Sequence, residues 1–227
     1  MEERYSIFDI AGPIMVGPSS SHTAGACKIG QYARALFNKT PKHVVFYLHG
    51  SFGEVYKGHA TDKALLAGVM KFQTGDPRMK DSFKIAKEKG IDFDFKVKSL
   101  GPNYHPNTVR IDMESASEKM SVIGSSIGGG VIEIVKINDF KVSLRGIAGK
   151  YFSLVVKHDD KPAVLKSLTA ILKSLEVVVS KVDSVKFRNK VLTVLSSQGK
   201  APKLKEVIEM EKIEGVDFVR ALTKLDK

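Results

Sequence analysis

The last part of the chain, residues 150–227, alternates strand-like and helix-like segments in an order that few folds can accommodate. An apolar strand is followed by a helix that begins at Pro162, by two Val-rich strands joined at Arg188–Asn189, by a second helix and by a closing strand. Proline suits the first position of a helix because no N–H group is needed there. The order βαββαβ is that of a ferredoxin-like sandwich. It predicts a fold and leaves the function open, because many unrelated functions share this architecture.

The residues before this region predict a second domain in which strands and helices are mixed. GPSSSHTAG (Gly17–Gly25) opens a helix-like stretch that runs to about Asn38, and its three serines are all competent N-caps. HVVFYLHG (His43–Gly50) has the composition of a buried strand, and Thr61 is expected to cap a second helix.

Further strand-like segments follow, and short turns separate the last of them. A strand with alternating apolar residues is expected at 92–98, and TVRIDM, SVIG, VIEIVKI and KVSLR follow it. Turns are expected at the Gly-rich Ser125–Gly130 and at Asn138–Asp139, and strands joined by such short turns pair antiparallel. The predicted fold class is α+β, with a mixed α/β domain at 1–148 and the ferredoxin-like domain at 149–227.

Composition places the chain among ordinary globular proteins, because 43% of its 227 residues are hydrophobic and 27% are charged. No apolar run approaches the ~18 residues needed to cross a bilayer, and the acidic N-terminal segment lacks the apolar core of a secretion signal. Cys27 is the single cysteine, so this chain cannot by itself form a disulfide or supply four thiolates to a cluster. We therefore expect a cytoplasmic protein with no membrane partner.

The net charge of +11 raises the question of nucleic-acid binding. Residues 1–139 carry +3 and residues 140–227 carry +8, so the excess lies in the C-terminal part. The lysines there are spaced singly and the chain has no Trp, so few side chains could stack on bases. This pattern favours a solvated lysine-rich surface and no nucleic-acid partner. A basic nucleic-acid-binding module is the alternative, and it requires a continuous basic stripe and salt-sensitive binding.

Four motifs follow one another along the chain: GPSSSHTAG, GSFGEVYKGHATDKAL (Gly50–Leu65), HPNTVRI (His105–Ile111) and SIGGGVIEI, with Ile127–Ile134 at its core. Together and in this order they resemble the beta portion of bacterial iron–sulfur L-serine dehydratases. In that family an ACT domain follows, as the βαββαβ region does here, so the resemblance covers almost the whole chain. A separate alpha subunit, or a fused alpha region, carries the cysteine ligands of a 4Fe–4S cluster in this family, and the single Cys27 agrees with a partner chain.

The resemblance implies a lyase that converts L-serine to pyruvate and ammonia without pyridoxal phosphate, and that is active only with the cluster-bearing alpha subunit. In the family one cluster iron acts as a Lewis acid on the serine hydroxyl, as in aconitase. The protein orients and desolvates the substrate. The resemblance leaves open which residue removes the Cα proton, whether a monovalent cation is needed, the subunit stoichiometry, and the preference for serine over threonine.

The resemblance gives catalytic roles to His22 and His105, because both motifs reach the substrate in the family. His22 lies in the first turn of a helix, where it could donate a hydrogen bond or move a proton near neutral pH. The alternative is that Ser20 or Ser21 caps the helix and His22 is merely exposed. His105 lies between two prolines that restrain its loop, and the alternative there is a structural turn. Substrate-binding roles are implied for Ser19, Ser20, Ser21, Thr23, His59 and Asn107.

Two further assignments have strong alternatives. His59 also fits plain helix initiation, and Cys27 fits a small core residue better than a cluster ligand. SSIGGG lacks the Lys of a phosphate-binding loop and precedes a strand, so we interpret it as a tight turn beside another subunit.

An effector site is implied where the first strand of the ACT-like region meets its first helix. N–H groups at a helix start favour a carboxylate. ACT domains that bind amino acids often carry Gly after the Pro, whereas Ala163 stands here. The options are an effector site and a domain that serves only for self-association. The residues concerned are His158, Asp160, Pro162, Ala163 and Val164.

The sequence therefore leaves two main hypotheses for the function. The first is an enzyme subunit that deaminates L-serine with its partner, and the second is an amino-acid-sensing regulatory subunit without catalytic groups. The enzyme hypothesis requires SSSHT and HPN to meet on one exposed face, and a sensor gives no reason for this.

Overall fold

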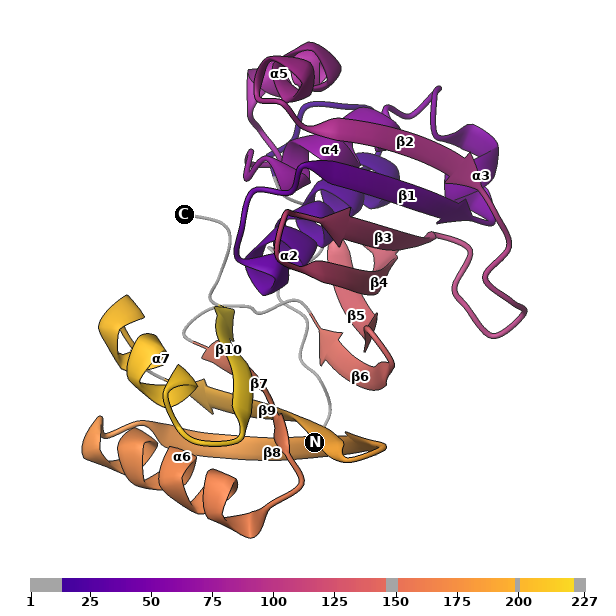
Figure 1. Cartoon of the computed structure of the whole chain (residues 1–227). Coiled ribbons are helices and arrows are strands. Elements are labelled where there is room, and N and C mark those ends of the chain that lie inside the picture. Colours follow the sequence, from indigo (N-terminus) through magenta and orange to yellow (C-terminus); the bar gives the residue numbers. More distant parts are fainter. Residues whose placement is uncertain (1–13, 146–150, 199–200, 223–227) are drawn as a thin grey trace. The chain divides into compact units, whose positions relative to one another are not determined.

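The computed structural model describes residues 14–145, 151–198 and 201–222 (Figure 1). They form two compact units, the first built from residues 14–138 with 142–145 and the second from 139–141 with the described residues after 150. The predicted boundary between residues 148 and 149 lies outside the described residues. Each unit is described by itself below.

The first unit is built on a six-stranded sheet in the order β2-β1-β3-β4-β5-β6. β1 and β2 pair in parallel, and the pairs β1–β3, β3–β4 and β4–β5 are antiparallel. The expected antiparallel pairing across the short turns is thus confirmed. The strands are β1 (His43–His49), β2 (Asp92–Val97), β3 (Thr108–Glu114), β4 (Lys119–Gly128), β5 (Val131–Ile137) and β6 (Phe140–Arg145).

Helices cover one face of this sheet, as Figure 1 shows for α2 and α4. Alternate residues of β1, namely Val44, Phe46 and Leu48, are fully buried on that face, which is why the strand has its apolar period of two. The helices are η1 (Ser20–Gly25), α2 (Ala26–Phe37), α3 (Ser51–Val55), α4 (Thr61–Val69), η2 (Pro77–Asp81) and α5 (Ser82–Glu88).

Two local expectations for this unit were wrong. Thr61 does not cap α4, because the N-cap position is Ala60 in the left-handed conformation and the Thr61 hydroxyl is buried without a partner among the described residues. The Gly-rich segment is shorter than expected as a turn, since β4 continues to Gly128 and only Gly129–Gly130 turn. Both have positive φ, as a two-residue hairpin requires.

The second unit has the predicted order βαββαβ. Its four strands lie in the order β10-β7-β9-β8 and all neighbours are antiparallel, which is the ferredoxin-like arrangement. The α+β fold class is confirmed. The elements are β7 (Tyr151–Asp159), α6 (Pro162–Ser174), β8 (Val178–Phe187), β9 (Lys190–Gln198), α7 (Leu204–Glu211) and β10 (Val216–Leu222).

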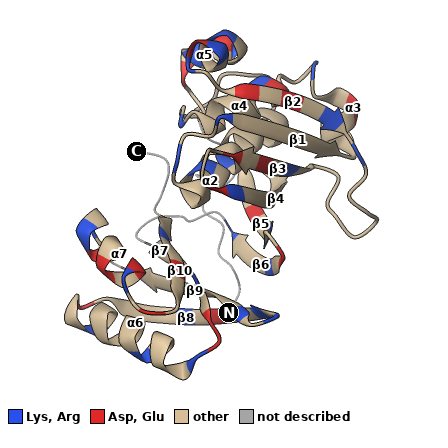
Figure 2. Cartoon of the chain, viewed as in Figure 1, with Lys and Arg blue, Asp and Glu red and all other residues tan. Residues whose placement is uncertain are grey.

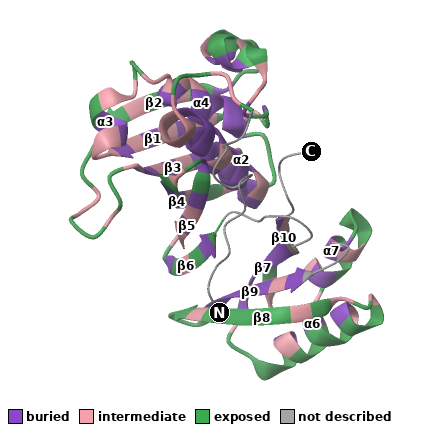
Figure 3. Ribbon diagram, turned by 180° about the vertical axis from the view of Figure 1, so that it is seen from behind, coloured by how far each residue is buried: buried purple, intermediate pink, exposed green. Residues whose placement is uncertain are grey.

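The core of this unit lies between the sheet and its two helices. Leu168 and Leu172 of α6 and Met210 of α7 are buried against the helix-facing residues of the strands, among them Leu154 and Val156. Figure 3 shows the contrast between these buried residues and the exposed β8.

Many lysines of the second unit are paired with carboxylates. Figure 2 shows where residues of both charges lie along the ribbon. Asp159 and Asp217 both accept from Lys190, at 2.8 and 2.6 Å. Lys157 pairs with Asp217 at 2.8 Å, and Lys186 pairs with Asp160. Some lysines of this region are therefore neutralised by neighbouring carboxylates, and the net excess of +8, which already counts those carboxylates, remains. Within the described part of the chain, no helix is both long and apolar enough to cross a membrane.

Candidate functional site

The predicted site lies at the edge of the first sheet where β1 ends, β3 begins and β4 ends. Gly50 follows β1, the loop 98–107 leads into β3, and Figure 1 shows that loop and α3 at the same end of the sheet. The backbone N–H of Ser126, near the end of β4, donates to the carbonyl oxygen of Asn107 at 2.9 Å. The HPN loop is therefore tied to β4 at this edge.

The SSSHT motif forms a π-helical turn at the start of α2. Ser19 is the N-cap, and its hydroxyl oxygen accepts from the backbone N–H of His22 at 3.1 Å. The carbonyl oxygen of Ser19 accepts from Thr23 N–H at 2.9 Å and from Ala24 N–H at 3.4 Å, so the turn is one residue wider than an α-helical turn. Isolated π-helical turns are rare and occur frequently at functional sites.

Small residues allow this turn to pack tightly against β4. A Cβ atom on Gly25 would lie only 2.1 Å from Ser126 Oγ, so no larger residue fits there without movement. Thr23 is fully buried, and its hydroxyl donates to the carbonyl oxygen of His59 at 3.0 Å. Thr23, which we expected at the substrate, thus joins η1 to the segment before α4 through its hydroxyl.

His22 is half-buried among three side chains, two from α3 and one from the turn between α3 and α4. Its Nε2 lies 3.0 Å from Ser51 Oγ, and its ring meets Phe52 edge-on at 5.4 Å between centroids. The ring of His59 lies 5.0 Å away, tilted by 35°. Ser19 Oγ lies 3.4 Å from Nδ1, on the other side of the ring. Two histidines from distant motifs are thus brought together.

Burial lowers the pKa of His22, and repulsion from His59 lowers it further. The imidazole is therefore neutral at pH 7, with one nitrogen as a donor and the other as an acceptor. A neutral, half-buried histidine is able to accept a proton or donate a hydrogen bond.

His105 is exposed on the HPN loop, and contacts on three sides hold that loop. The His105 Nδ1 accepts from Asn107 N–H at 3.1 Å, and its carbonyl oxygen accepts from the Thr108 hydroxyl at 2.6 Å. Pro106 packs closely on Gly50, and a Cβ added to Gly50 would lie only 2.9 Å from Pro106 Cα. Phe52 N–H also points to the Pro106 carbonyl oxygen at 3.4 Å.

Residues 50–52 thus contact both the SSSHT turn and the HPN loop, and the two motifs lie at one edge of the sheet. Ser20, Ser21 and Asn107 are partly exposed at this edge. Among the predicted residues, Ser19 and Thr23 use their hydroxyls within the chain, while the histidines present rings to the site.

Two residues that contact the motif around η1, Ser51 and Ser126, were not singled out from the sequence, and neither was Asp62 in the first turn of α4. Ser51 lies within the second motif, but a serine after a strand is too common to be assigned a role. Asp62 is largely buried, and this burial raises its pKa against the opposing hydrogen bond from Lys63 N–H. Ser126 is fully buried, and its hydroxyl has no hydrogen-bond partner among the described residues. Only burial, which the motif does not reveal, distinguishes Asp62 and Ser126.

The described residues contain no group of three or more His, Cys, Asp or Glu side chains arranged to hold a metal ion. Cys27 is buried in α2, where its thiol donates to the carbonyl oxygen of Phe72 at 3.4 Å. This chain therefore does not fit a resident iron–sulfur cluster, and Cys27 has the core environment expected for it.

The residues of the predicted effector site are divided between core and surface. His158 is buried, with Nε2 2.9 Å from the Thr193 hydroxyl and Nδ1 2.6 Å from the carbonyl oxygen of Asp159. Val164 is a core residue, whereas Pro162 and Ala163 are exposed at the start of α6. An open hollow of about 630 Å³ adjoins this junction, and it is lined by Asp159, Asp160, Lys161, Lys186, Arg188 and Asn189.

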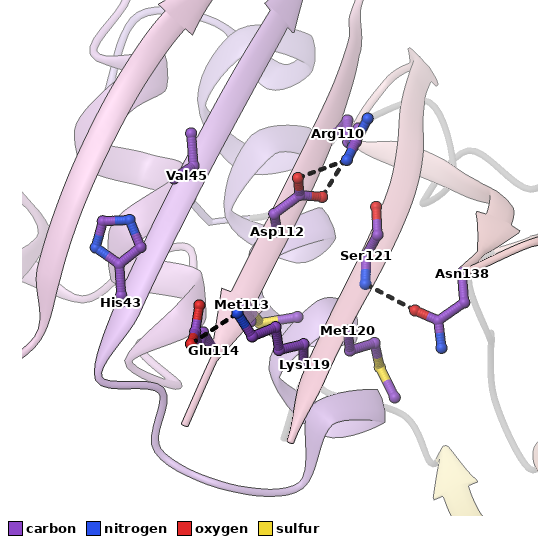
Figure 4. Close-up of a pocket in the computed structure, with 10 residues that line it drawn as sticks. All are labelled: His43, Val45, Arg110, Asp112, Met113, Glu114, Lys119, Met120, Ser121 and Asn138. Atoms are coloured by element: carbon purple, nitrogen blue, oxygen red, sulfur yellow. Dashed lines mark hydrogen bonds and ion pairs between the residues drawn. The ribbon is translucent and has the colours of Figure 1, made fainter. Parts of the chain in front are cut away.

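A separate open hollow of about 430 Å³ lies toward the opposite ends of β1, β3 and β4 (Figure 4). Its charged groups are paired with each other, since Arg110 binds Asp112 through two hydrogen bonds and Lys119 pairs with Glu114 at 2.9 Å. Asn138 accepts from the backbone N–H of Ser121. None of the four motifs contributes a histidine to this hollow, so the candidate site is the edge that carries His22.

Comparison with known proteins agrees with the motifs. Residues 6–136 match the family model of the serine dehydratase beta chain. The chain is 41% identical to the L-serine dehydratase beta chain of Peptoniphilus asaccharolyticus over 85% of both proteins. It is 42% identical to the probable L-serine dehydratase beta chain of Bacillus subtilis (strain 168) over 77% of both. The solved ACT domain of a Chlorobium tepidum GTP pyrophosphokinase aligns with 32% of this chain and 96% of its own, at 13% identity and a TM-score of 0.27. With a matching family model over more than half its length and two such relatives, the chain belongs to the family of L-serine dehydratase beta chains.

Proposed function

We propose that the chain is the beta subunit of an iron–sulfur L-serine dehydratase, and that it converts L-serine to pyruvate and ammonia together with a cluster-bearing alpha subunit. The observation that carries this proposal is the meeting of the SSSHT turn and the HPN loop through residues 50–52. A regulatory subunit without catalytic groups has no need for this arrangement.

In this proposal His22 and His105 contact the substrate. Burial and the neighbouring His59 keep His22 neutral at pH 7, so its imidazole can accept a proton. His105 is exposed, and the restraint of its loop by Gly50 and β4 keeps its ring at a fixed place on the surface. The partly exposed hydroxyls of Ser20 and Ser21 supply donors for the substrate carboxylate.

The cluster belongs to the alpha subunit in this proposal, because the described residues of this chain supply no ligand set and Cys27 is used in the core. The exposed edge that carries His105 is then the surface that meets the alpha subunit. No pyridoxal phosphate takes part.

The test is the activity of the assembled enzyme with single substitutions in this chain. The chain is produced with and without an alpha subunit, and kcat and KM for L-serine are measured anaerobically on complexes matched for iron content. The chain alone is expected to be inactive and to bind no stoichiometric cluster on reconstitution with iron and sulfide. His22→Ala and His105→Ala are each expected to lower kcat/KM by about 10²–10³-fold, or ~2.7–4 kcal/mol.

His43→Ala is the matched control, because His43 lies at the other end of β1, where its Nδ1 pairs with Asp92 at 2.7 Å. An exposed pair of this kind contributes little, so activity should be retained. If both His22→Ala and His105→Ala keep near-normal kcat/KM, the catalytic role is wrong and the amino-acid-sensing hypothesis replaces it.

A further inference from the structure

Ser51 is held in place by an unusual backbone conformation at the end of β1. Gly50, which precedes it, has φ 54° and ψ −131°, a region that residues with a side chain rarely adopt. Gly50 also packs directly on Pro106. The Ser51 side chain therefore leaves the end of the strand in a direction that the strand, the glycine and the HPN loop fix together.

The shortest side-chain hydrogen bond to the His22 ring is the one with Ser51. The distance from His22 Nε2 to Ser51 Oγ is 3.0 Å, which lies within hydrogen-bond range, whereas Ser19 Oγ is 3.4 Å from Nδ1. Ser19 Oγ already accepts from the backbone N–H of His22. Phe52 and His59 contact the ring itself without bonding either nitrogen. Ser51 is thus placed to determine which nitrogen of His22 faces the site.

We propose that Ser51 is the positioning residue of His22, and that its hydroxyl fixes the orientation of the imidazole ring through the bond to Nε2. A serine hydroxyl can donate to a ring nitrogen or accept from it, so this bond holds the ring in place in either neutral tautomer. Partners of this kind change the rate on the order of 10–100-fold when they are lost, because the reacting group is then misplaced. The kinetic part of this inference rests on the proposed function, and the part about the ring does not.

The ring is tested in the full chain alone. The ¹⁵N shifts of the His22 imidazole are followed by NMR between about pH 5 and 8 in the wild type, Ser51→Ala and Ser51→Thr, with His22→Gln to assign the signal. Ser51→Ala is expected to change the ¹⁵N shifts and the titration midpoint of the His22 ring, because the bond to Nε2 is lost, and Ser51→Thr, which keeps the hydroxyl, is expected to restore both. Unchanged ¹⁵N shifts in Ser51→Ala overturn the proposal.

Ser115→Ala is the matched control, because Ser115 is also a half-buried serine of this unit and bonds only the backbone of the β3–β4 turn. Its His22 signals should equal those of the wild type. If Ser51→Ala does not fold, Ser51→Cys replaces it, because cysteine is similar in size and is a weaker hydrogen-bond donor. Altered ¹⁵N shifts of His22 in Ser51→Cys then support the proposal, and unchanged shifts overturn it.

The assembled enzyme supplies the second measurement. Ser51→Ala is expected to lower kcat by about 10–100-fold with KM for L-serine changed less than about twofold, and Ser51→Thr to recover most of the loss. A rise in KM with kcat unchanged contradicts a positioning role. If the wild-type complex does not deaminate L-serine, the proposed function fails, while the NMR result still decides whether Ser51 orients His22.

Discussion

Gly30 of α2 and Gly68 of α4 bring the two helices into direct backbone contact. A Cβ on Gly68 would lie 2.1 Å from the carbonyl oxygen of Cys27, and a Cβ on Gly30 would lie 2.3 Å from that of Leu65. Both neighbours are backbone atoms, so they cannot turn away as a flexible side chain could. Because η1 continues into α2, this crossing also determines where His22 lies.

Gly68→Ala should therefore destabilise the first unit. Alanine favours the helical state by ~1 kcal/mol over glycine, but overpacking against a backbone costs about 1–3 kcal/mol or more, and the second effect should win. Chemical denaturation of the full chain measures the difference. Gly58→Ala is the control, since the added Cβ meets only Val55 O at 3.7 Å. Equal stability of the two variants would show that α2 and α4 can separate freely.

His59→Gln should raise the pKa of His22. Burial is the larger cause of the lowered His22 pKa and repulsion from His59 is the smaller one, so removing the His59 charge leaves only the effect of burial. In the wild type, the unfolded chain binds more protons than the folded chain at pH values between the lowered pKa of His22 and its ordinary value of ~6.5. The contribution of His22 to the free energy of unfolding is therefore complete above pH ~6.5, and it is lost as pH falls through the lowered pKa. NMR titration of His22 measures the shift. A lower or unchanged value in His59→Gln would contradict the coupling.

Ser126→Ala should leave the chain equally stable or make it more stable. The Ser126 hydroxyl is buried without a partner in the described part of the chain, so its loss removes a desolvation cost of about 1–3 kcal/mol and no hydrogen bond. Thr108→Val is the contrast, because the Thr108 hydroxyl bonds both His105 O and Ser125 Oγ, and its loss should cost about 1–3 kcal/mol. Thermal unfolding at equal protein concentration compares them. A destabilised Ser126→Ala would mean that the hydroxyl is satisfied in solution.

The ion pairs around Lys190 should make the second unit sensitive to acid. Hydrogen bonds from Lys190 and Lys161 lower the pKa of Asp159, and in Asp217 bonds from Lys157 and Lys190 outweigh the opposing effect of burial. Their stabilising effect is present above the unfolded value of ~3.9 and is lost as pH falls below it. Asp217→Asn should thus lower the melting temperature at neutral pH, and this effect should shrink as pH falls below ~3.9. A constant difference across this range would exclude the linkage.

The exposed edge strand β8 should mediate self-association. Val178 and Val182 are 72% and 55% exposed on a strand whose outer backbone groups face no neighbour within its sheet. Such an edge pairs readily with another copy. Sedimentation of the full chain should show a concentration-dependent dimer, and Val178→Lys with Val182→Lys should weaken it. A monomer at all concentrations would leave the second unit without this role.

Because Ala163 stands where amino-acid-binding domains often carry Gly, only weak thermal stabilisation by L-serine is expected.

The sequence predicted the second unit almost completely, because its information is local. Arg188 has the positive φ of a hairpin turn and Pro162 begins α6, as their chemistry requires. In the first unit, α3, η2 and α5 were not predicted. They are short, and tertiary packing stabilises them more than any period of apolar residues does.

From the motifs we expect His22, His59 and His105 to belong to one site, which stays a prediction, and the motifs do not show how their segments are connected. The connection depends on contacts between distant segments, such as Gly50 with Pro106 and Thr23 with the His59 carbonyl oxygen. Such contacts follow from the strand order, which places the end of β1 beside the start of β3. No single segment contains that information.

The π-helical turn at Ser20–Gly25 also determines which changes in chain length the site can survive. A π-helical turn contains one residue more than the α-helical turn it replaces. Deleting a single residue there would restore the regular hydrogen-bond pattern, and it would rotate everything on one side of the deletion by about 100° and shift it by about 1.5 Å relative to the other. His22 would then leave Ser51, although His22 itself and the three other motifs would still be present. A chain of this family that lacked one residue in this turn could therefore fold with a more regular helix and have no assembled site.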